Sequence, residues 1–548
     1  MMRQRHLQAL TEMTYDVLII GGGINGAVAA AALSGNGLKT ALIDQRDFAG
    51  FTSQQSSNLV WGGIKYLETF EFALVRQLCK SRNALLRHYP SSVREIRFLT
   101  TIHKGFRHHP AMLWGGAWLY WLMGNGVTRV PRWLSARRIK RDEPAIRTDG
   151  SLGGIEYSDA YLCDHDARFV FNFVRSALDD GCVAANYVES LGSHRRDDLW
   201  HTRAQDGLTG RALTIRSRVL INATGPFVDA MNRRNGESTE HRHVFSKGIH
   251  LIVDQVTPNP RVLAFFADDG RLFFVIPMGS KTCVGTTDTR VDSPLTAVTE
   301  ADREFVLSHI NRLLKLARPL GTDDIIAERC GVRPLAVQGH ASDQQHFLTL
   351  SRKHAIEVNP DRMHMSIFGG KLTDCLNVGE EICTITEKLG LPLPRPRQKW
   401  YGEPDASVHA DFMQRARAIK LDDLTPADGT EALSARLWRR YGNQAFRLLK
   451  AIEKDAMQAE PILAGTAFIR SEIELMAERE MIVTLEDFLR RRSDLALVTR
   501  HHDLRRAAGL MDVCTILFGA DQAAQKFDDY FDAKNSASGA VFWSMPHP

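Results

Sequence analysis

A glycine-rich turn near the start of the chain has the residue types and spacing to bind a dinucleotide. The apolar residues 17–20 lead into Gly21-x-Gly23-x-x-Gly26, and a second apolar run ends at Asp44. In this pattern the first glycine permits a tight turn, the second lets the backbone approach a pyrophosphate, and the third allows helix and strand to pack closely. The helix N-terminus offers N–H groups to the phosphates, and the acid accepts hydrogen bonds from a ribose. The pattern predicts a dinucleotide site; the alternative is a glycine-rich turn in an ordinary strand–helix–strand unit.

Two later segments favour a flavin over a nicotinamide cofactor, because an NAD enzyme needs only the first strand–helix–strand unit. Residues 220–226 (LINATGP) are an apolar run that ends in a turn of small residues, of the kind that passes beneath a bound FAD. Residues 366–373 (SIFGGKLT) are a second run that leads through a glycine pair into a helix. The N-terminus of that helix can stabilise negative charge on the reduced flavin ring. The three elements together predict FAD as the cofactor.

The elements that hold these segments divide into a long α/β part and a helical end. Helical periodicity covers residues 70–88, and a proline-rich stretch at 391–396 predicts a linker. We therefore predict an α/β fold: an FAD-binding Rossmann-type domain interleaved with a mixed-sheet substrate-binding (cap) domain over residues 1–390, then a C-terminal helical domain over 391–548. Breaker-bounded apolar runs predict strands at 218–222, 250–253, 272–276 and 283–285, and Ala/Leu/Arg-rich periodicity predicts helices at 431–454 and 472–492.

The bulk composition limits the partners. A chain of 548 residues is too long for a single core. The net charge of +5 favours an anionic substrate or membrane surface and is too small to argue for nucleic acid. The eight cysteines form no C-x-x-C pair, so we predict no zinc, iron–sulfur or other metal site and a reducing compartment.

One short stretch has the composition of a membrane anchor. Residues 111–124 (AMLWGGAWLYWLMG) contain three tryptophans and are flanked by Lys104, Arg107, Arg129 and Arg132. Aromatic residues beside cations suit the lipid headgroup boundary, whereas a buried helix or a homodimer contact are the alternatives. No apolar run reaches the ~20 residues of a spanning helix, and the first fourteen residues lack the apolar core of a signal peptide. We expect a cytoplasmic protein peripherally associated with the inner face of the membrane.

In these motifs the chain resembles the FAD-dependent, aerobic-type glycerol-3-phosphate dehydrogenases. The resemblance covers nearly the whole chain and implies oxidation of sn-glycerol 3-phosphate to dihydroxyacetone phosphate. It also implies hydride transfer to N5 of FAD and onward transfer of electrons to a membrane quinone. The matching segments, in the family's order, are residues 20–27, 52–68, 98 onward, 156–160, 222–229, 247–250, 275–289, 331–335, 368–374 and 485–492.

Such an oxidation needs a cationic pocket for phosphate and a base for the hydroxyl proton. Arg333 in GVRPL can grip phosphate through two hydrogen bonds, and the resemblance adds Arg352 and Lys371. His250 in KGIH is the candidate base, because imidazole accepts a proton near neutral pH; it could instead only hydrogen-bond flavin or substrate. The resemblance also implies substrate contacts from Lys65 and Tyr66 and cofactor contacts from Gly21, Gly23, Asn25, Gly26, Asp44, Thr52, Ser53, Ser57, Gly225, Gly370, Lys371, Leu372 and Thr373.

Four positions depart from the family pattern. Trp61 and Lys65 stand where the family usually has His and Arg, so a titratable group and a planar guanidinium are lost. Asn58 replaces a common lysine. Asp374 places a negative charge after Thr373, which would weaken phosphate binding if it faced the pocket and would change nothing if it faced the first turn of the helix.

These departures keep two other hypotheses open. One is an FAD-dependent oxidoreductase that acts on a different hydroxy acid or amine. The other is a catalytically silent flavin-binding protein. The sequence leaves undecided the electron acceptor (quinone or oxygen), the oligomeric state, the identity of the base and whether FAD is covalently attached.

Overall fold

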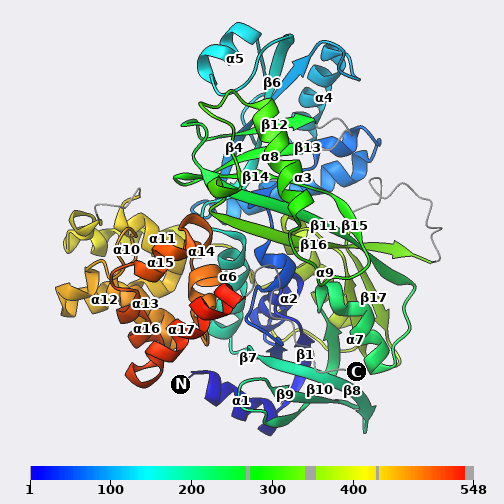
Figure 1. Cartoon of the computed structure of the whole chain (residues 1–548). Coiled ribbons are helices and arrows are strands. Elements are labelled where there is room, and N and C mark those ends of the chain that lie inside the picture. Colours follow the sequence, from blue (N-terminus) through cyan, green and yellow to red (C-terminus); the bar gives the residue numbers. More distant parts are fainter. Residues whose placement is uncertain (1, 267–271, 340–352, 427–430, 537–548) are drawn as a thin grey trace.

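A computed structural model describes residues 2–266, 272–339, 353–426 and 431–536 of the chain. Figure 1 shows two sheets, one at the bottom of the view and one above it, with a group of helices from the C-terminal third packed beside them. The cofactor segments predicted from the sequence lie where the lower sheet meets the upper one.

The lower sheet is a Rossmann-type sheet with strand order β17-β18-β10-β1-β2-β7. Strands β18, β10, β1, β2 and β7 run parallel, and β17 closes one edge antiparallel to β18. Parallel strands are covered by helices on their faces, which explains the continuous apolar run of residues 17–20. The alanine-rich helix α2 (Ile24–Gly35), which follows the glycine turn, contacts α6 and α9.

Side chains of β1 alternate between two cores. Val17 and Ile19 pack against α2, α6 and α9, whereas Leu18 and Ile20 pack on the opposite face with α1 and the β8–β9 strands. Both faces of the sheet are therefore buried, and only the ends of the strands remain available for a ligand.

The upper sheet is mixed and carries most of the predicted substrate residues. Its strand order is β15-β11-β14-β13-β12-β4-β6-β3, with β16 paired to β11 and β5 paired to β6. Ile249, Leu251 and Val253 of β11 face helix α8, so the intervening residues of the same strand face the lower sheet. The long β11–β16 pair thus forms the surface that the cofactor segments meet.

The strands are β1 (Thr14–Ile20), β2 (Thr40–Ile43), β3 (Leu59–Val60), β4 (Val93–His103), β5 (Arg132–Leu134), β6 (Ser151–Leu162), β7 (Val183–Ala185), β8 (Val188–Arg196), β9 (Leu199–Asp206), β10 (Ala212–Asn222), β11 (His241–Asp254), β12 (Arg261–Phe266), β13 (Leu272–Met278), β14 (Lys281–Gly285), β15 (Thr289–Val291), β16 (Ala327–Gln338), β17 (Ala355–Asn359) and β18 (His364–Phe368). The helices up to the linker are α1 (Met2–Glu12), α2, α3 (Phe72–His88), α4 (Pro110–Met123), α5 (Ala136–Asp142), α6 (Asp166–Asp179), α7 (Val228–Asn235), α8 (Glu300–Leu313) and α9 (Cys375–Lys388).

The C-terminal third is helical and has its own apolar core. A π-helical turn, η10 (Asp487–Arg492), lies in this region and contacts α6 of the lower part. The helices are α10 (Ala406–Ala418), α11 (Leu433–Tyr441), α12 (Ala445–Lys454), α13 (Arg470–Arg479), α14 (Leu495–Val498), α15 (His501–Arg506), α16 (Leu510–Phe518) and α17 (Ala520–Ser536).

The predicted fold class is confirmed: a Rossmann-type sheet, a mixed second sheet and a helical C-terminal part are all present. The division at residue 390 stays a prediction. The segment that follows it packs closely on the lower part, because Trp400 fills the space left by Gly35 and Gly379. Among the described residues, no helix combines the length and the apolar composition needed to cross a bilayer.

Candidate active site

The glycine turn has the geometry its sequence predicts. Gly21 has φ +105°, a left-handed conformation that L side chains rarely adopt, and a Cβ on it would lie 2.5 Å from Ala223 O. A Cβ on Gly26 would lie 1.7 Å from Gly21 O, so the start of α2 packs directly on the end of β1. The turn therefore brings the N-terminus of α2 to the carboxyl ends of the parallel strands, where such sheets bind ligands.

Thr52 and Ser53 link this turn to the upper sheet. The Ser53 hydroxyl accepts a hydrogen bond from Ile24 N at 2.9 Å, and the Thr52 hydroxyl donates to Val332 O at 2.7 Å. Ser53 thus satisfies one of the N–H groups at the start of α2, the position at which a phosphate oxygen would accept.

Asp44 lies on the other side of the glycine turn. Its carboxylate accepts hydrogen bonds from Gly22 N at 2.6 Å and from Arg46 N at 2.8 Å. Burial raises the pKa of Asp44 to about 6. The acid is held in place by backbone groups and retains acceptor capacity for a ribose hydroxyl.

The segments at residues 220–226 and 366–373 both lie against the glycine turn. Ala223, at the end of β10, lies against Gly21 and precedes Gly225. The Asn25 side chain donates to Gly369 O at 3.1 Å, which ties the glycine turn to the pair Gly369 and Gly370. The Thr373 hydroxyl, two residues beyond Lys371, donates to the Trp61 carbonyl at 3.4 Å.

These observations fit FAD. The glycine turn offers the start of α2, Asp44 offers a carboxylate, and two further strand–turn–helix segments meet at the same edge of the sheet. A dinucleotide cofactor needs this combination of backbone N–H groups and a ribose acceptor. The predicted cofactor residues therefore come together around one edge, although their contacts with FAD stay predictions.

The substrate side is built on the β11–β16 pair. Ser246, Gly248 and His250 of β11 stand opposite Arg333, Gly331 and Arg329 of β16, and directly opposed residues in a ladder point to the same face. Both glycines make room on that face. A Cβ on Gly248 would lie 2.2 Å from the Arg333 guanidinium, and a Cβ on Gly331 would lie 2.9 Å from Gln55.

Arg333 lies across Gly248 with its guanidinium held by neutral and acidic groups. Its Nη2 donates to the Thr286 hydroxyl at 3.0 Å, and its Nη1 contacts the Ser246 hydroxyl at 3.4 Å and Asp288 Oδ1 at 3.8 Å. About a quarter of the side chain is exposed (27%), so the group is oriented without being sealed off. That is the arrangement expected of a cation that also binds an anionic ligand.

His250 is buried beside the two arginines. Its relative exposure is 3%, and neither ring nitrogen has a hydrogen-bond partner among the described residues. Burial, together with the Arg329 and Arg333 charges, lowers the pKa of His250 to about 3. The imidazole is therefore neutral at physiological pH, with both ring nitrogens enclosed, and the lowered pKa makes it a weaker base than a free imidazole.

Lys371 lies on an aromatic platform. Its Nζ donates to the Tyr66 hydroxyl at 2.7 Å and lies 4.2 Å from the Tyr66 ring centroid and 5.6 Å from the Trp61 ring centroid. Lys65 precedes Tyr66 in the short helix η2 (Ile64–Leu67) and is half-buried. The sequence departure at Trp61 thus supplies a ring that faces a cation, an attractive arrangement.

Asp374 does not present an unpaired charge to the site. It is buried and accepts hydrogen bonds from Ser81 Oγ at 2.8 Å, Asn377 Nδ2 at 2.5 Å and His354 Nδ1 at 3.0 Å. His354 also contacts Glu381 Oε2 at 2.9 Å. Burial lowers the pKa of His354, but the hydrogen bonds to both acids outweigh it and raise the pKa to about 9.

Arg352, predicted to contact the substrate, lies outside the residues that the structure describes. Lys247, which precedes the predicted base in KGIH, forms an ion pair with Asp302 (2.5 Å) instead of facing the site. Two arginines near the site were missed by the sequence reasoning, Arg329 and Arg490. The signal for the first was its place four residues before Arg333, which puts both on one face of a strand; the second lies in the arginine run of residues 490–492.

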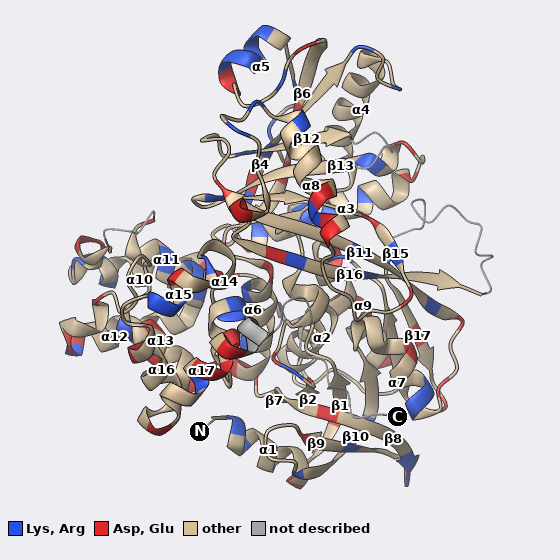
Figure 2. Cartoon of the chain, in the orientation of Figure 1, with Lys and Arg blue, Asp and Glu red and all other residues tan. Residues whose placement is uncertain are grey.

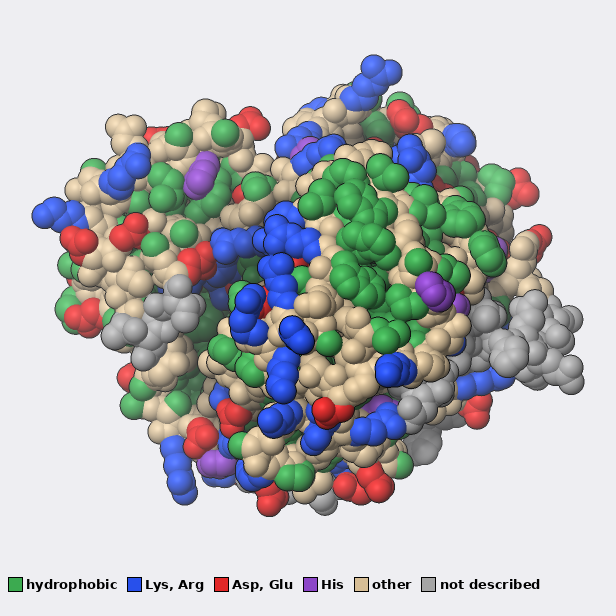
Figure 3. Space-filling view, turned by 90° about the horizontal axis from the view of Figure 1, so that it is seen from above, with side chains coloured by type: hydrophobic (Ala, Val, Ile, Leu, Met, Phe, Trp, Pro, Cys, Tyr) green, Lys and Arg blue, Asp and Glu red, His purple; other side chains and the backbone are tan. Residues whose placement is uncertain are grey.

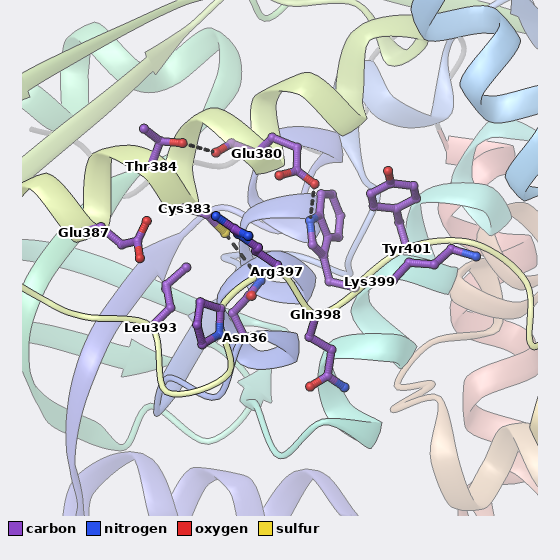
Figure 4. Close-up of a pocket in the computed structure, with 12 residues that line it drawn as sticks. Asn36, Glu380, Cys383, Thr384, Glu387, Leu393, Arg397, Gln398, Lys399 and Tyr401 are labelled. Atoms are coloured by element: carbon purple, nitrogen blue, oxygen red, sulfur yellow. Dashed lines mark hydrogen bonds between the residues drawn. The ribbon is translucent and has the colours of Figure 1, made fainter.

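An open pocket of about 780 Å³ lies elsewhere. Figure 4 shows its lining between the outer face of α9 and the linker after it, with Asn36, Glu380 and Lys399 among the labelled residues. Asn36 follows the C-terminal end of α2, and the twelve residues of that helix separate it from the glycine turn by about 18 Å. The pocket is therefore distinct from the junction of cofactor and substrate residues.

The geometry and the fold define a flavoprotein of the FAD-dependent oxidoreductase class. Residues 16–353 match the FAD dependent oxidoreductase family, and residues 404–525 match the C-terminal domain of alpha-glycerophosphate oxidase. Within that class, the chain belongs to the glycerol-3-phosphate dehydrogenase family.

Curated relatives support this assignment along nearly the whole length. The chain is 31% identical to the aerobic glycerol-3-phosphate dehydrogenase of Bacillus subtilis, over 90% of this chain and 89% of the relative. It is 29% identical to a glycerol-3-phosphate dehydrogenase of Synechocystis, over 96% and 98%. The fold resembles that of the Bacillus halodurans glycerol-3-phosphate dehydrogenase complexed with FAD, with a TM-score of 0.74 and 24% identity over 99% of each chain.

Proposed function

We propose that this protein oxidises sn-glycerol 3-phosphate at C2 to dihydroxyacetone phosphate and passes the electrons to a membrane quinone. The main observation behind the proposal is the β11–β16 face. There the buried, neutral His250 lies beside Arg333, whose guanidinium can bind phosphate. The relatives named for the same reaction support the choice of substrate.

In this proposal Arg333 and Lys371 hold the phosphate group. Arg333 provides a planar fork oriented by Thr286, and Lys371 provides a point charge oriented by Tyr66. Lys65 adds a third positive charge, and the substrate contact of Arg352 stays a prediction. The combined effect of Arg333, Lys371 and Lys65 is to fix the substrate so that C2 and its hydroxyl have one orientation.

His250 then takes the C2 hydroxyl proton. Its imidazole is neutral and its ring nitrogens have no partner among the described residues, so one of them can accept the proton directly. Bound FAD supplies the hydride acceptor and the two-electron link to a quinone. Removal of one proton and one hydride converts the alcohol to the ketone with all atoms accounted for.

The cofactor is held by the three strand–turn–helix segments. We assign the pyrophosphate to the start of α2 and to Ser53, and the ribose to Asp44. The remaining contacts follow the predicted set: Gly21, Gly23, Asn25, Gly26, Thr52, Ser57, Gly225, Gly370, Leu372 and Thr373.

Anaerobic reduction of the purified flavoprotein tests the reaction. Addition of glycerol 3-phosphate should bleach the visible flavin band, and unphosphorylated glycerol at the same concentration should not. A panel of hydroxy acids and amines tests the alternative substrates. A flavin that none of these donors reduces, but that dithionite reduces, would support the silent flavin-binding protein.

We also propose that helix α4 and its neighbours bind a membrane surface. Helix α4 buries only Ala117 and Tyr120, so the alternative of a buried helix is wrong. Four of its apolar side chains are exposed: Met112, Trp118, Leu119 and Leu122. Figure 3 looks down on this end of the molecule and shows a continuous apolar area with Lys and Arg at its margin.

Cations beside this area favour an anionic bilayer as the occupant. Helix α5 next to it is mostly Lys and Arg (Figure 2), and Arg129 and Arg132 are exposed. Further exposed apolar groups come from Val127, Val130 and Trp133. Exposed tryptophans with adjacent cations match the interface of a membrane, where rings and charges lie at the headgroups. We therefore propose that the protein associates peripherally with the inner face of the membrane.

Vesicle flotation tests the surface. Trp118→Ser with Leu122→Ser should lower binding to vesicles that contain anionic lipid by at least tenfold, because two large apolar side chains leave the interface. Leu208→Ser, an exposed leucine on the β9–β10 turn, is the matched control and should bind as the native chain does. A native chain that does not bind vesicles but dimerises through α4, as judged by light scattering of the same variants, would replace the membrane by a homodimer contact.

A separate experiment tests the identity of the electron acceptor. A substrate-reduced protein should be reoxidised without oxygen by a soluble quinone analogue. Reoxidation by oxygen alone would make the enzyme an oxidase and would leave the substrate assignment intact.

A further inference from the structure

The peptide segment from Gln54 to Ser56 is held by three buried charged side chains from three parts of the chain. Arg490 donates to Gln54 O, and Arg329 donates to Ser56 O. Asp166 accepts from Ser56 N at 2.7 Å. Hydrogen bonds between buried charged side chains and consecutive peptide groups are unusual for a loop, because loop backbone is normally solvated.

The three side chains come from far apart in the sequence. Asp166 is the first residue of α6 in the lower part, Arg329 lies on β16 of the upper sheet, and Arg490 lies in η10 of the helical C-terminal part. The segment they hold lies between Thr52 and Ser53 on one side and Ser57 on the other. It is therefore the place where all three parts of the molecule meet at the predicted cofactor loop.

The rest of η10 binds the neighbouring loop. Arg491 Nε and Arg492 Nη1 both donate to Asp47 Oδ2 at 2.8 Å, and Arg492 Nη2 donates to Asp47 Oδ1 at 2.9 Å. Asp47 follows Asp44 by three residues. The arginine run thus holds both loops that follow β2, the one expected to meet the ribose and the one expected to meet the rest of the cofactor.

The electrostatics set Arg490 and Arg329 apart from the other two arginines. Arg491 and Arg492 are paired with Asp47, whereas neither Arg490 nor Arg329 forms an ion pair among the described residues. Arg490 Nη1 and Arg329 Nε and Nη2 also have no hydrogen-bond partner there. Burial and the neighbouring Arg329 charge lower the pKa of Arg490 to about 10.

Two buried guanidiniums without an ion-pair partner are costly even though Asp166 is nearby, and a neutral amide would satisfy the same carbonyl oxygens at a lower cost. A costly arrangement of this kind is expected where function requires it. A π-helical turn, as in η10, is also a feature that occurs often at functional sites.

We propose that Arg490, together with Arg329, is a positioning residue for FAD: it fixes the Gln54–Ser56 backbone so that the C-terminal helical part completes the cofactor site. The proposal requires that the loop serves FAD and does not depend on the identity of the substrate. It predicts that loss of the contact between Arg490 and Gln54 has a larger effect on the affinity for FAD than on the stability of the C-terminal helices.

The test is the dissociation constant of FAD, measured by flavin fluorescence on apoprotein titrated with FAD. Arg490→Gln should raise the constant by about 10-fold or more, the effect of a lost hydrogen bond from a charged group. Arg490→Lys, which keeps the charge and one donor, should bind FAD more tightly than the glutamine variant. Both should retain the reduction assay's preference for glycerol 3-phosphate over glycerol if that substrate is correct.

Arg436→Gln is the matched control. Arg436 is an equally buried arginine of the C-terminal part, but it pairs with Glu472 inside that part. If Arg490→Gln binds FAD no more weakly than Arg436→Gln, the contact only stabilises the helices and the proposal is wrong. If Arg490→Gln does not fold, Arg490→Lys and Arg329→Gln provide the same comparison with the same criterion.

Discussion

Two buried histidines near the predicted site have opposite surroundings. His250 lies on β11 with Arg329 and Arg333 beside it, and burial together with these charges lowers its pKa to about 3. His354 lies between Asp374 and Glu381, and its hydrogen bonds to them outweigh burial and raise its pKa to about 9. The same side chain at similar depth is neutral in one place and protonated in the other.

The difference shows how the fold can give one buried histidine a chemical role and the other a structural role. Around His250 the ring nitrogens have no partner among the described residues, so the group can take a proton from a ligand. Around His354 both ring nitrogens are engaged by carboxylates, so the imidazolium offsets the charge of Asp374 and has no nitrogen left to accept a proton. A buried polar group without a partner costs stability, and that cost is expected at a reacting group.

The largest effect is expected at the base. His250→Asn should lower kcat by about 100-fold to 10,000-fold, the usual contribution of a positioned general base. KM for glycerol 3-phosphate should change much less, because the phosphate contacts remain. Steady-state assay with a quinone analogue measures both constants.

His354→Asn is the control for this prediction. It alters an equally buried histidine and should keep kcat within about tenfold of the native value, since His354 makes no contact expected to reach the substrate. Equal losses in the two variants would mean that His250 has a structural role only.

The next effect concerns the cation beside His250. Arg333→Gln should raise KM for glycerol 3-phosphate by about 10- to 100-fold, because a hydrogen-bonded charge pair with phosphate is lost. Arg303→Gln is the control, because Arg303 on α8 pairs with Glu328 of the same β16 strand. Competitive inhibition by inorganic phosphate should weaken in parallel for Arg333→Gln; unchanged inhibition would remove Arg333 from the phosphate site.

Much of the predicted FAD-binding part of the site could be recognised from the sequence, because its conformational requirements lie within short segments of the chain. Gly21 needs its left-handed φ and Gly26 its close contact within one strand–turn–helix unit, and such units have a fixed spacing. Apolar runs also predicted strands at residues 218–222 and 272–276, and these residues lie within β10 and β13. For these elements the neighbours in sequence are also the neighbours in space.

The electrostatic environment could not be predicted in the same way. The pairing of Asp374 with His354 joins residues on either side of the β17–β18 hairpin, and the contact of Arg490 with Gln54 joins residues 436 positions apart. The sequence left open whether Asp374 would weaken phosphate binding; the fold answers by burying it against an imidazolium. Charge patterns that depend on tertiary contacts carry no local signal.

The smallest effect is a pH dependence of stability with opposite signs at the two histidines. An unfolded histidine titrates near its ordinary pKa of about 6.5. His250 has a lowered folded pKa, so its environment costs stability increasingly as pH falls below about 6.5. His354 has a raised folded pKa, so its stabilisation is complete below about 6.5 and is lost as pH rises toward 9.

Urea unfolding of the apoprotein between pH 5 and 9 measures both slopes. The loss attributable to His354 should be about 1–3 kcal/mol across its window, and His354→Asn should remove the decline between pH 6.5 and 9. His250→Asn should instead reduce the decline between pH 6.5 and 5 and leave the alkaline limb unchanged. Because each variant should flatten one limb only, a variant that flattens both would show that the two histidines titrate as a coupled pair, and a variant that flattens neither would show that their surroundings do not set their charge.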